Sequence, residues 1–333
     1  MKAVHIKNYS KNIDTVLNDI PKPEISDSEV LIQVKAAAVN PVELLILTGS
    51  VKLIQDYSMP LTLGNECSGI VEQVGSKVEG FQTGDLVYTR LPLDKIGAFA
   101  EYVAVDQKEI AKMPDGYDFT TAAAIPLTGL TAYQAITEEL EAKPGQTILI
   151  PGGSGSFGQM AVPIAKALGL HVIVTGNERA REQFLSMGVD RYMDYKQDNY
   201  WEQLSEIDHV IDTLGPDEFE HELSVLKKGG RLVSLRTGPN KAFAERKQFS
   251  GMKKQLFALA GNKYDKAAKK QGKEYRFVFV RSDGAQLQKI TEIVEKQQIK
   301  PAVDSRIFSL DQANDALRLV AQGSLNGKVI IQP

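Results

Sequence analysis

Cysteine is almost absent from this chain of 333 residues, which contains only Cys67. A single cysteine excludes an internal disulfide and every zinc site that needs several cysteines. Long apolar runs are absent too, and the opening residues 1–6 read as a strand rather than as the apolar core of a signal peptide. We therefore expect a cytoplasmic protein with no membrane partner.

A strong charge of either sign is also missing, since the formal net charge is −3. This balance argues against nucleic acid as a partner and favours a small molecule. Residues 241–275 are locally rich in lysine, which is more typical of a solvated helix surface than of a binding site. Hydrophobic residues make up 43% of the chain, so a sizeable core is available.

Two patterns follow each other along the chain. Up to about residue 110, short β segments alternate with Gly, Pro and Asp, as at 29–34, 66–74, 85–89 and 98–105, which predicts a β-rich domain. From residue 119, an Ala-rich helix over 120–140 leads into strands that alternate with helices, and this order predicts a doubly wound parallel sheet. The expected strands are 147–150, 171–175, 208–212, 231–235 and 275–280. A helix at 284–297, a strand at 302–308, a helix at 311–321 and a strand at 328–331 then return to the first domain.

A glycine-rich loop joins the first of these parallel strands to the next helix. Gly153, Gly155 and Gly158 fit the spacing G-x-G-x-x-G, which allows a tight turn, close approach of a pyrophosphate and close packing of helix on strand. Phosphate would then lie at the N-terminus of a helix, against free N–H groups. The loop predicts a dinucleotide site formed by Gly153, Ser154, Gly155, Ser156, Phe157 and Gly158, with a purely structural turn as the alternative.

Taken together, several segments resemble the medium-chain dehydrogenase/reductase superfamily, in its zinc-free quinone oxidoreductase and enone reductase branch. The resemblance covers nearly the whole chain and rests on the order and spacing of short motifs, namely 37–41, 64–69, 84–85, 97–102, 124–133 and 327–329. It implies an α/β protein with a GroES-like catalytic domain at 1–122 and 298–333 and a Rossmann cofactor domain at 123–297.

The departures from the zinc-dependent members concern the metal ligands. Those members have a catalytic cysteine where this chain has Asn40, and Gly-His-Glu where it has Gly64-Asn65-Glu66. Catalytic zinc needs about three N, S or O ligands from the protein, and asparagine is a poor substitute for imidazole or thiolate. We therefore expect no metal. A substrate that accepts hydride without a Lewis acid, such as a quinone or an α,β-unsaturated carbonyl, is then favoured.

The choice of cofactor depends on the residues after the second parallel strand. Thr175 ends that strand, and by family spacing Asn177 takes the place where NAD-specific folds have an acid. Arg179 follows and suits the 2′-phosphate of NADPH, although a shift of one residue would bring Glu178 there and favour NADH. In related quinone reductases a tyrosine near the adenosine phosphate corresponds to Tyr195, for which a plain turn is the alternative.

The resemblance also implies residues around the nicotinamide and the substrate. Asn40 would orient a carbonyl, with a turn-forming role before Pro41 as the alternative, and Thr128 would face the nicotinamide unless it only caps its helix. Gly215 and Phe279 are expected to border the cofactor. Lys328 matches a family lysine near the cofactor, with a surface charge as the alternative.

The proton donor is less well defined by the sequence. Many zinc-free relatives have a tyrosine where this chain has Lys52, and Tyr57 lies five residues further on. Tyr57 is our candidate donor, and a packing role is the competing interpretation.

The residues Tyr275 to Val280 form an apolar run that would be exposed at a sheet edge. In this family the corresponding strand pairs with its copy across a two-fold axis, so a homodimer is expected. For the whole chain we therefore expect an NADPH-dependent reductase of quinones or α,β-unsaturated carbonyls. The competing hypotheses are a nucleotide-binding regulatory protein without catalysis and an RNA-binding relative of the quinone reductases.

Overall fold

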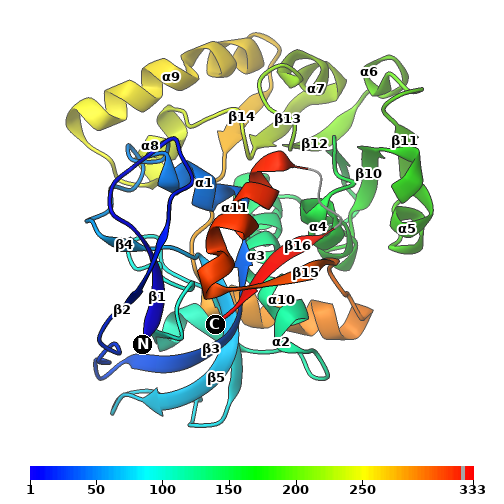
Figure 1. Cartoon of the computed structure of the whole chain (residues 1–333). Helices are drawn as coiled ribbons and strands as arrows, with labels where there is room; N and C mark the ends of the chain where they lie inside the picture. The colour runs from blue at the N-terminus through cyan, green and yellow to red at the C-terminus, as the bar shows by residue number, and fades with distance from the viewer. Residues whose placement is uncertain (324–326) are drawn as a thin grey trace. The chain divides into compact units, whose positions relative to one another are not determined.

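The structure is a computed structural model that describes residues 1–323 and 327–333. The chain forms two compact units, which are described separately. Unit 1 contains Met1–Leu130 and Arg281–Pro333, and unit 2 contains Thr131–Val280. In Figure 1, unit 1 comprises the blue and cyan segments and the orange to red segments, whereas unit 2 is mostly green and yellow.

Unit 1 is built on two β-sheets. The smaller sheet has the order β2-β1-β4, and the larger has the order β15-β16-β3-β5-β6-β8, with β7 also paired to β3. The strands are β1 (Lys2–Ile6), β2 (Val16–Asp19), β3 (Glu29–Val39), β4 (Leu61–Thr62), β5 (Glu66–Val74), β6 (Leu86–Arg90), β7 (Tyr102–Asp106), β8 (Ile110–Lys112), β15 (Val303–Ser309) and β16 (Lys328–Gln332). The β-rich first half expected from the sequence is therefore present, with somewhat different strand limits.

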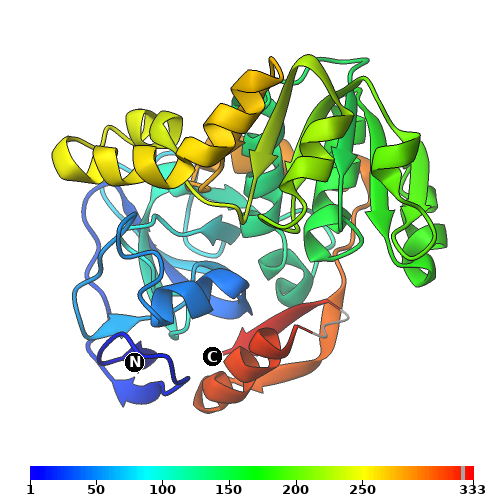
Figure 2. The same ribbon diagram turned by 90° about the horizontal axis from the view of Figure 1, so that it is seen from above.

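Strand β16 joins residues from distant parts of the chain. It lies antiparallel to β3 with Val329 opposite Val39, so that Lys328 lies next to Asn40. On its other side β16 runs parallel to β15. Figure 2 shows the red helix α11 (Ala313–Gln322) beside β15 and β16, where its apolar face is buried. The predicted return of the tail to the β-rich domain is thus observed.

The helices of unit 1 are short except for α10. They are α1 (Pro41–Leu47), α2 (Phe119–Ala123), α10 (Gly284–Gln297), α11 and the 3-10 turns η1 (Gln107–Glu109) and η4 (Leu310–Gln312). Helix α1 begins directly after β3 with a capping box, because Glu43 accepts a hydrogen bond from the backbone N–H of Asn40. Small side chains let α2 approach the large sheet closely, where Ala123 packs against Ala36 and Ala38.

Unit 2 contains a six-stranded sheet of the order β11-β10-β9-β12-β13-β14, in which every pair is parallel. The strands are β9 (Thr147–Ile150), β10 (His171–Gly176), β11 (Arg191–Asp194), β12 (Ile207–Asp212), β13 (Leu226–Ser234) and β14 (Glu274–Phe277). Counted from β9, the order is 3-2-1-4-5-6, the order of a dinucleotide-binding doubly wound fold. The predicted fold class is confirmed, and the strand order reverses between β9 and β12.

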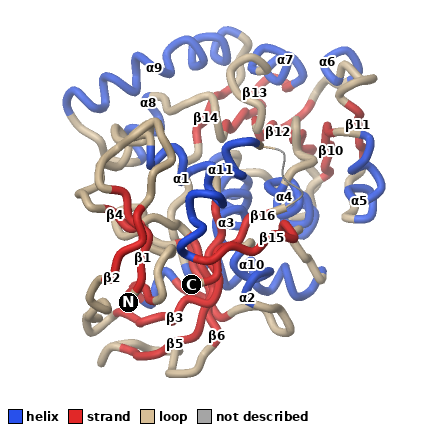
Figure 3. The backbone as a smooth tube through the Cα atoms, viewed as in Figure 1, coloured by secondary structure: helices blue, strands red, loops and turns tan. Residues whose placement is uncertain are grey.

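Helices accompany these strands, as Figure 3 shows for the blue segments beside the red sheet of unit 2. They are α4 (Ser156–Ala167), α5 (Arg181–Ser186), α6 (Tyr200–Gln203), α7 (Phe219–Val225), α8 (Lys241–Arg246), α9 (Gly251–Lys270) and the 3-10 turn η3 (Glu178–Ala180). The apolar core of the unit includes Leu149, Val210, Phe219 and Leu232. The lysine-rich segment 241–275 is thus mainly the two helices α8 and α9.

The single helix predicted over 120–140 is wrong. The structure has α2, then α3 (Pro126–Gln134), then a π-helical turn η2 (Ala135–Glu139). Pro126 has no N–H and disfavours helical geometry in the residue before it, so it ends one helix and begins the next. This break gives α3 its own N-terminus at Pro126.

The limits of the compact units differ from the expected domain limits of residues 122 and 298. The chain passes from one unit to the other after Leu130 and after Val280, so that helix α10 belongs to unit 1. Helix α10 packs against β8 and η1, and Gly284 lies so close to the backbone of Ile110 that a Cβ there would be 2.4 Å from its carbonyl oxygen. The alternation of strands and helices in the sequence did not indicate that α10 packs in unit 1 rather than in unit 2.

Candidate functional site

The glycine loop of unit 2 connects β9 to α4 and is built for close approach. A Cβ on Gly158 would lie 1.6 Å from the carbonyl oxygen of Gly153, so this position requires glycine for the helix to pack on the strand. A Cβ on Gly155 would meet nothing within 4 Å. Gly155 is exposed and serves as the N-cap of α4 without a side chain that satisfies the first N–H groups. The loop therefore offers open backbone donors at the start of a twelve-residue helix, which fits a pyrophosphate.

Two buried side chains hold the glycine loop and the loop after β12 in place. Thr175, at the end of β10, accepts a hydrogen bond from the N–H of Gly152 at 3.0 Å. Asp212, at the end of β12, accepts hydrogen bonds from the N–H groups of Leu214 and Gly215 at 2.8 and 2.6 Å. Because β9 and β12 flank the point where the strand order reverses, the glycine loop and Gly215 lie at the edge of the sheet where doubly wound folds generally bind ligands.

The loops after β10 and β11 bring the expected adenosine-side residues together. These strands are adjacent and parallel, with Gly176 opposite Asp194, so the segments that begin at Asn177 and Tyr195 leave the same edge. Arg179 and Tyr195 are both exposed, and Arg179 forms no ion pair with any residue that the structure describes.

Glu178, the residue that complicates cofactor choice, is already paired. Both of its carboxylate oxygens accept from Nε of Arg181 at 2.8 Å, and Arg181 also donates to the carbonyl oxygen of Tyr192 at 3.0 Å. Asn177 keeps its side chain free of capping, and its carbonyl oxygen accepts from the Tyr192 hydroxyl at 2.6 Å. Arg179 therefore presents a guanidinium with no ion pair among the described residues, two positions after the neutral amide of Asn177. Phe279 is half-buried beyond the end of β14.

In unit 1 the predicted residues Asn40 and Lys328 meet at a buried carboxylate that the sequence analysis had treated only as part of a motif. Glu66 is fully buried at the start of β5. One of its oxygens accepts from Asn40 Nδ2 at 2.8 Å and from Lys328 Nζ at 2.9 Å, and the other accepts from the N–H of Leu127 at 2.6 Å. Lys328 also donates to Asn40 Oδ1. We call Asn40, Glu66 and Lys328 the buried triad.

The amide of Asn40 is fully committed within this triad. Its Nδ2 group donates to Glu66 and also to the carbonyl oxygen of Ala38 at 3.3 Å, so both hydrogens are used. Its Oδ1 accepts from the ammonium group, which fixes the orientation of the amide. Asn40 is 2% exposed, and Lys328 is 5% exposed. The interpretation of Lys328 as a surface charge is therefore wrong.

A second buried carboxylate, Glu43, adjoins the triad. It accepts hydrogen bonds from the backbone N–H of Asn40 at 2.7 Å and from Asn65 Nδ2 at 2.8 Å. Burial raises the pKa of Glu43 to about 7, with the nearby charge of Glu66 acting in the same direction and the hydrogen bonds opposing it. Asn65 thus donates to the buried carboxylate of Glu43, and Glu66 is the buried carboxylate of the triad. The motif Gly64-Asn65-Glu66 did not reveal these contacts.

Thr128 and Tyr57 lie in different surroundings within unit 1. The Thr128 hydroxyl donates to carbonyl oxygens one turn earlier, at 3.1 Å to Ala124, as a helix-start residue often does. The Tyr57 hydroxyl is buried and has no hydrogen-bond partner among the described residues. Burial raises the pKa of Tyr57 to about 12, although the positive charge of Arg90 opposes the shift.

Arg90 is a functional-site candidate that the sequence analysis missed. It ends β6, is 1% exposed, and donates to the carbonyl oxygen of Leu91. Burial lowers the pKa of Arg90 to about 10, while Tyr57, Glu43 and Glu66 act in the opposite direction. A buried arginine is rare without a partner, but nothing in its local sequence distinguishes it from a surface arginine at the end of a strand.

These residues do not fit a catalytic zinc ion. Where zinc-dependent relatives have cysteine and histidine ligands, this chain has Asn40 and Asn65, neutral amides that are poor substitutes for thiolate and imidazole, and their Nδ2 groups donate to Glu66 and Glu43. Burial raises the pKa of the Cys67 thiol to about 12, so it does not supply a thiolate. Among residues 1–323 and 327–333, no three His, Cys, Asp or Glu side chains gather as a metal site.

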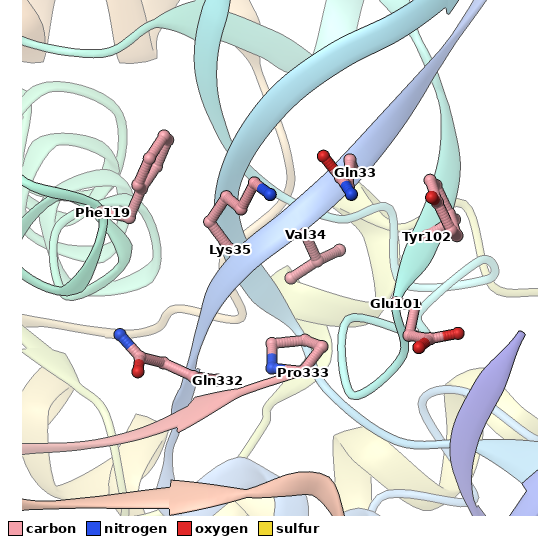
Figure 4. A pocket seen from close by; sticks show the side chains of 8 residues that line it. All are labelled: Gln33, Val34, Lys35, Glu101, Tyr102, Phe119, Gln332 and Pro333. Atoms are coloured by element: carbon pink, nitrogen blue, oxygen red, sulfur yellow. The ribbon is translucent and has the colours of Figure 1, made fainter.

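Unit 1 also has a hollow of about 400 Å³ that is separate from the buried triad. Figure 4 shows its lining from β3 and neighbouring segments, namely Gln33, Val34, Lys35, Glu101, Tyr102, Phe119, Gln332 and Pro333. None of the predicted site residues lines it. In addition, no helix in the described part of the chain is long and apolar enough to cross a membrane.

Comparison with known proteins agrees with this geometry. Residues 26–115 match the alcohol dehydrogenase GroES-like domain, and residues 187–331 match a family described as zinc-binding dehydrogenase. A 2-methylene-furan-3-one reductase of Solanum lycopersicum is 32% identical, with 100% of this chain and 79% of the relative covered. A chloroplastic NADPH-dependent alkenal/one oxidoreductase of Arabidopsis thaliana is 30% identical, with 95% and 75% covered.

A solved structure shows that the similarity also holds for the fold. The quinone oxidoreductase from Coxiella burnetii superimposes with a TM-score of 0.82 at 27% identity, covering 100% of this chain and 99% of the other. The two reductases align with residues of both units of this chain. The observed sheet order is that of the Rossmann fold. The chain belongs to the medium-chain dehydrogenase/reductase superfamily, among its quinone oxidoreductases and enone reductases.

Proposed function

We propose that this protein is an NADPH-dependent reductase of quinones or α,β-unsaturated carbonyls that works without a metal ion. The observation that carries the proposal is the combination of an open dinucleotide loop with metal-ligand positions that hold two amides. A substrate that takes up hydride and one proton needs no Lewis acid when it is an activated electrophile: a quinone becomes a hydroquinone, and an enone becomes a saturated carbonyl.

NADPH, when bound, supplies the hydride, and the residues of this chain hold it. The N-terminus of α4 would receive the pyrophosphate, with Thr175 and Asp212 fixing the two loops that border it. Arg179 supports NADPH over NADH because it is exposed and has no ion pair among the described residues, while the carboxylate of Glu178 is paired with Arg181. Tyr195, Gly215 and Phe279 are proposed as further contacts of the cofactor.

Within unit 1, Tyr57 remains our candidate proton donor, since its buried hydroxyl has no partner among the described residues. The change Tyr57→Phe should lower kcat on an enone by about 100-fold, a typical effect for a general acid, while the free energy of unfolding stays within about 1 kcal/mol. Full retention of kcat would instead assign protonation to solvent. We propose that the triad and Thr128 form part of the wall of the substrate site.

The whole proposal is tested by following NADPH oxidation with a panel of quinones, enals and enones. Turnover with at least one class, unchanged after treatment with a strong chelator, is the expected result. Tight NADPH binding without turnover of any compound would support a regulatory protein instead, and activity that disappears with the chelator would contradict the metal-free mechanism.

A homodimer and a cytoplasmic location are part of the same proposal. Strand β14 lies at the end of the six-stranded sheet, which supports pairing with a second copy, although the strand covers only Glu274–Phe277 of the expected run. Light scattering at micromolar concentration should give twice the mass of the chain, and a monomer would contradict the dimer. The location can be checked by microscopy of a tagged protein.

A further inference from the structure

Helix α9, the long yellow helix of Figure 1, is held against unit 2 by one of its faces. The buried positions of this face recur every three or four residues and are Phe257, Gly261, Tyr264 and Ala268. The ring of Phe257 packs against that of Phe243, with centroids 5.7 Å apart. A Cβ on Gly261 would lie 2.4 Å from Cβ of Asn240, so the two segments are in close contact. These contacts fix which side of α9 faces outward.

The outward side begins with three exposed apolar residues. Met252 is 78% exposed, Leu259 is 73% exposed and Leu256 is 43% exposed. Their spacing of four and three residues places them on one side of the helix. Because the buried face fixes the rotation of α9, the helix cannot turn these side chains into the core of unit 2.

Lysines continue the same side of the helix. Lys263, Lys266 and Lys270 follow at the same helical spacing and are exposed, and none of them forms an ion pair with any residue that the structure describes. We call the whole row the outer stripe of α9, which consists of Met252, Leu256, Leu259, Lys263, Lys266 and Lys270.

The polarity of the helix explains only part of this positive charge. Lys270 lies in the last turn, where a cation stabilises the C-terminal end of a helix, but Lys263 and Lys266 come before that turn. Asp265 is the one acidic residue of α9, and it accepts a hydrogen bond from Asn240 Nδ2 at 2.7 Å. The outer stripe is therefore apolar in its first half and positive in its second, in a chain with a net charge of −3.

The size and charge of the outer stripe favour a lipid surface over a protein as its partner. Three apolar side chains are far fewer than the roughly 20–30 residues on each side of a stable protein interface. A bilayer can take up a few apolar side chains at shallow depth, and its anionic headgroups attract nearby lysines. No helix in the described part of the chain could cross a membrane, so the contact is with the surface alone.

We propose that the outer stripe of α9 binds the surface of a bilayer rich in anionic phospholipid, with its apolar residues in the headgroup region and its lysines against the anionic groups. The exposure of these side chains revises the expectation of no membrane partner, which depended on composition and on the lack of a long apolar run. Binding to vesicles can be measured without substrate or cofactor, so this inference does not rest on the proposed reductase activity.

The test is sedimentation of the full chain with vesicles of equal parts phosphatidylcholine and phosphatidylserine, and with vesicles of phosphatidylcholine alone. The native chain should bind the anionic vesicles at least tenfold more tightly than the neutral ones. Raising KCl from about 0.1 M to about 0.5 M should weaken the binding at least tenfold, because salt screens exposed charges.

Two sets of variants separate the apolar and the charged half of the outer stripe. Replacement of its three apolar residues by glutamine keeps the charge and should lower the affinity for anionic vesicles at least tenfold. Lys263→Gln with Lys266→Gln should do the same, whereas the matched control Lys289→Gln with Lys296→Gln, on exposed positions of α10, should bind like the native chain. All these positions are exposed, so the urea midpoints should stay unchanged.

A fluorescent label reports insertion directly. Cys67 is completely buried, so a thiol-reactive, polarity-sensitive dye should label Leu259→Cys selectively. Its emission should shift to the blue with anionic vesicles, whereas the same dye on Lys289→Cys should not respond.

Four results would overturn the proposal. The first is a native chain that does not bind anionic vesicles, and the second is unchanged binding by the apolar or the lysine variant of α9. The third is a native oligomer whose mass the apolar variant halves, which would make the outer stripe an interface between copies. The fourth is binding to soluble polyglutamate as tight as binding to the vesicles, which would indicate an acidic protein as partner.

Discussion

The buried triad of unit 1 and the glycine loop of unit 2 use their polar groups in opposite ways. Asn40, Glu66 and Lys328 are almost entirely buried and make their hydrogen bonds to one another or to neighbouring backbone. The glycine loop leaves Gly155 exposed at the start of α4, and Arg179 nearby is exposed without an ion pair among the described residues. One region is internally satisfied, whereas the other keeps donors available for an anion.

This difference predicts which substitutions should lower stability and which should lower ligand affinity. In the triad each group is the partner of another, so the loss of one leaves a buried polar group unsatisfied and lowers stability before any ligand is added. In the glycine loop the side chains are small or absent, and the open positions should affect ligand affinity more than folding. Four predictions test this contrast.

The largest effect is expected for Lys328→Met, which removes the only ion pair that the buried Glu66 carboxylate forms among the described residues. The free energy of unfolding should fall by about 3–5 kcal/mol, as it does when one partner of a buried pair is removed. Urea denaturation measures the change, and adding Glu66→Gln to this variant should recover at least half of it. A loss below about 1 kcal/mol would mean that the triad is not a stability element.

Next is the pH dependence of stability that Glu43 contributes. Its pKa is raised from 4.5 to about 7, so the native state holds this proton to higher pH than the unfolded chain does. The Glu43 contribution is therefore most favourable below pH 4.5 and is lost as pH rises to about 7, by about 3 kcal/mol for a shift of this size. Urea denaturation from pH 4.5 to 8 should show this decline for the native chain relative to Glu43→Gln. Parallel curves for the two proteins would contradict the prediction.

The third prediction compares two glycines of the same loop. Gly158→Ala would force a Cβ to within 1.6 Å of the carbonyl oxygen of Gly153, and it should lower stability by about 1–3 kcal/mol without any ligand present. Gly155→Ala meets no atom within 4 Å, so its melting temperature should stay unchanged while its affinity for NADPH falls. Thermal unfolding and fluorescence titration of NADPH distinguish the two effects, and equal melting temperatures for both variants would be the contrary result.

The smallest effect is expected for Arg179→Ala, which should leave stability unchanged because the side chain is exposed and forms no ion pair among the described residues. The KM for NADPH should rise about tenfold or more, as for the loss of a charge-assisted phosphate contact, and the KM for NADH should hardly change. Glu182→Ala, on an exposed neighbour in α5, is a matched control. If both cofactors respond equally to Arg179→Ala, the 2′-phosphate is bound elsewhere.

Much of this architecture could be predicted because local patterns determine it. The strand before Gly153, the spacing of the three glycines and the alternation that follows indicate a doubly wound sheet, since each feature depends on residues close together in the sequence. The helix limits at Pro126 were missed even though proline marks them, because the Ala-rich composition on both sides suggested one continuous helix.

The arrangement of the triad could not be predicted from such patterns. Lys328 and Asn40 are 288 residues apart, and only the pairing of β16 with β3 brings them together. For the same reason Glu66 and Arg90 gave no signal beyond their residue type, since burial in a sheet depends on strands that are distant in the sequence. Of the site residues, those in the glycine loop follow from spacing, whereas the partners of Asn40 follow only from topology.

The place of β16 in the large sheet also has a consequence for the order in which the chain folds during synthesis. Unit 2 is one continuous segment, Thr131–Val280, so all of its residues can leave the ribosome before unit 1 is complete. The partner of Asn40 is synthesised 288 residues later, which at about 5–20 residues per second is a delay of about 15–60 s. During that time the β3 edge that β16 will cover and the Glu66 carboxylate lack their final partners. The domain that begins the sequence is therefore the last to be completed.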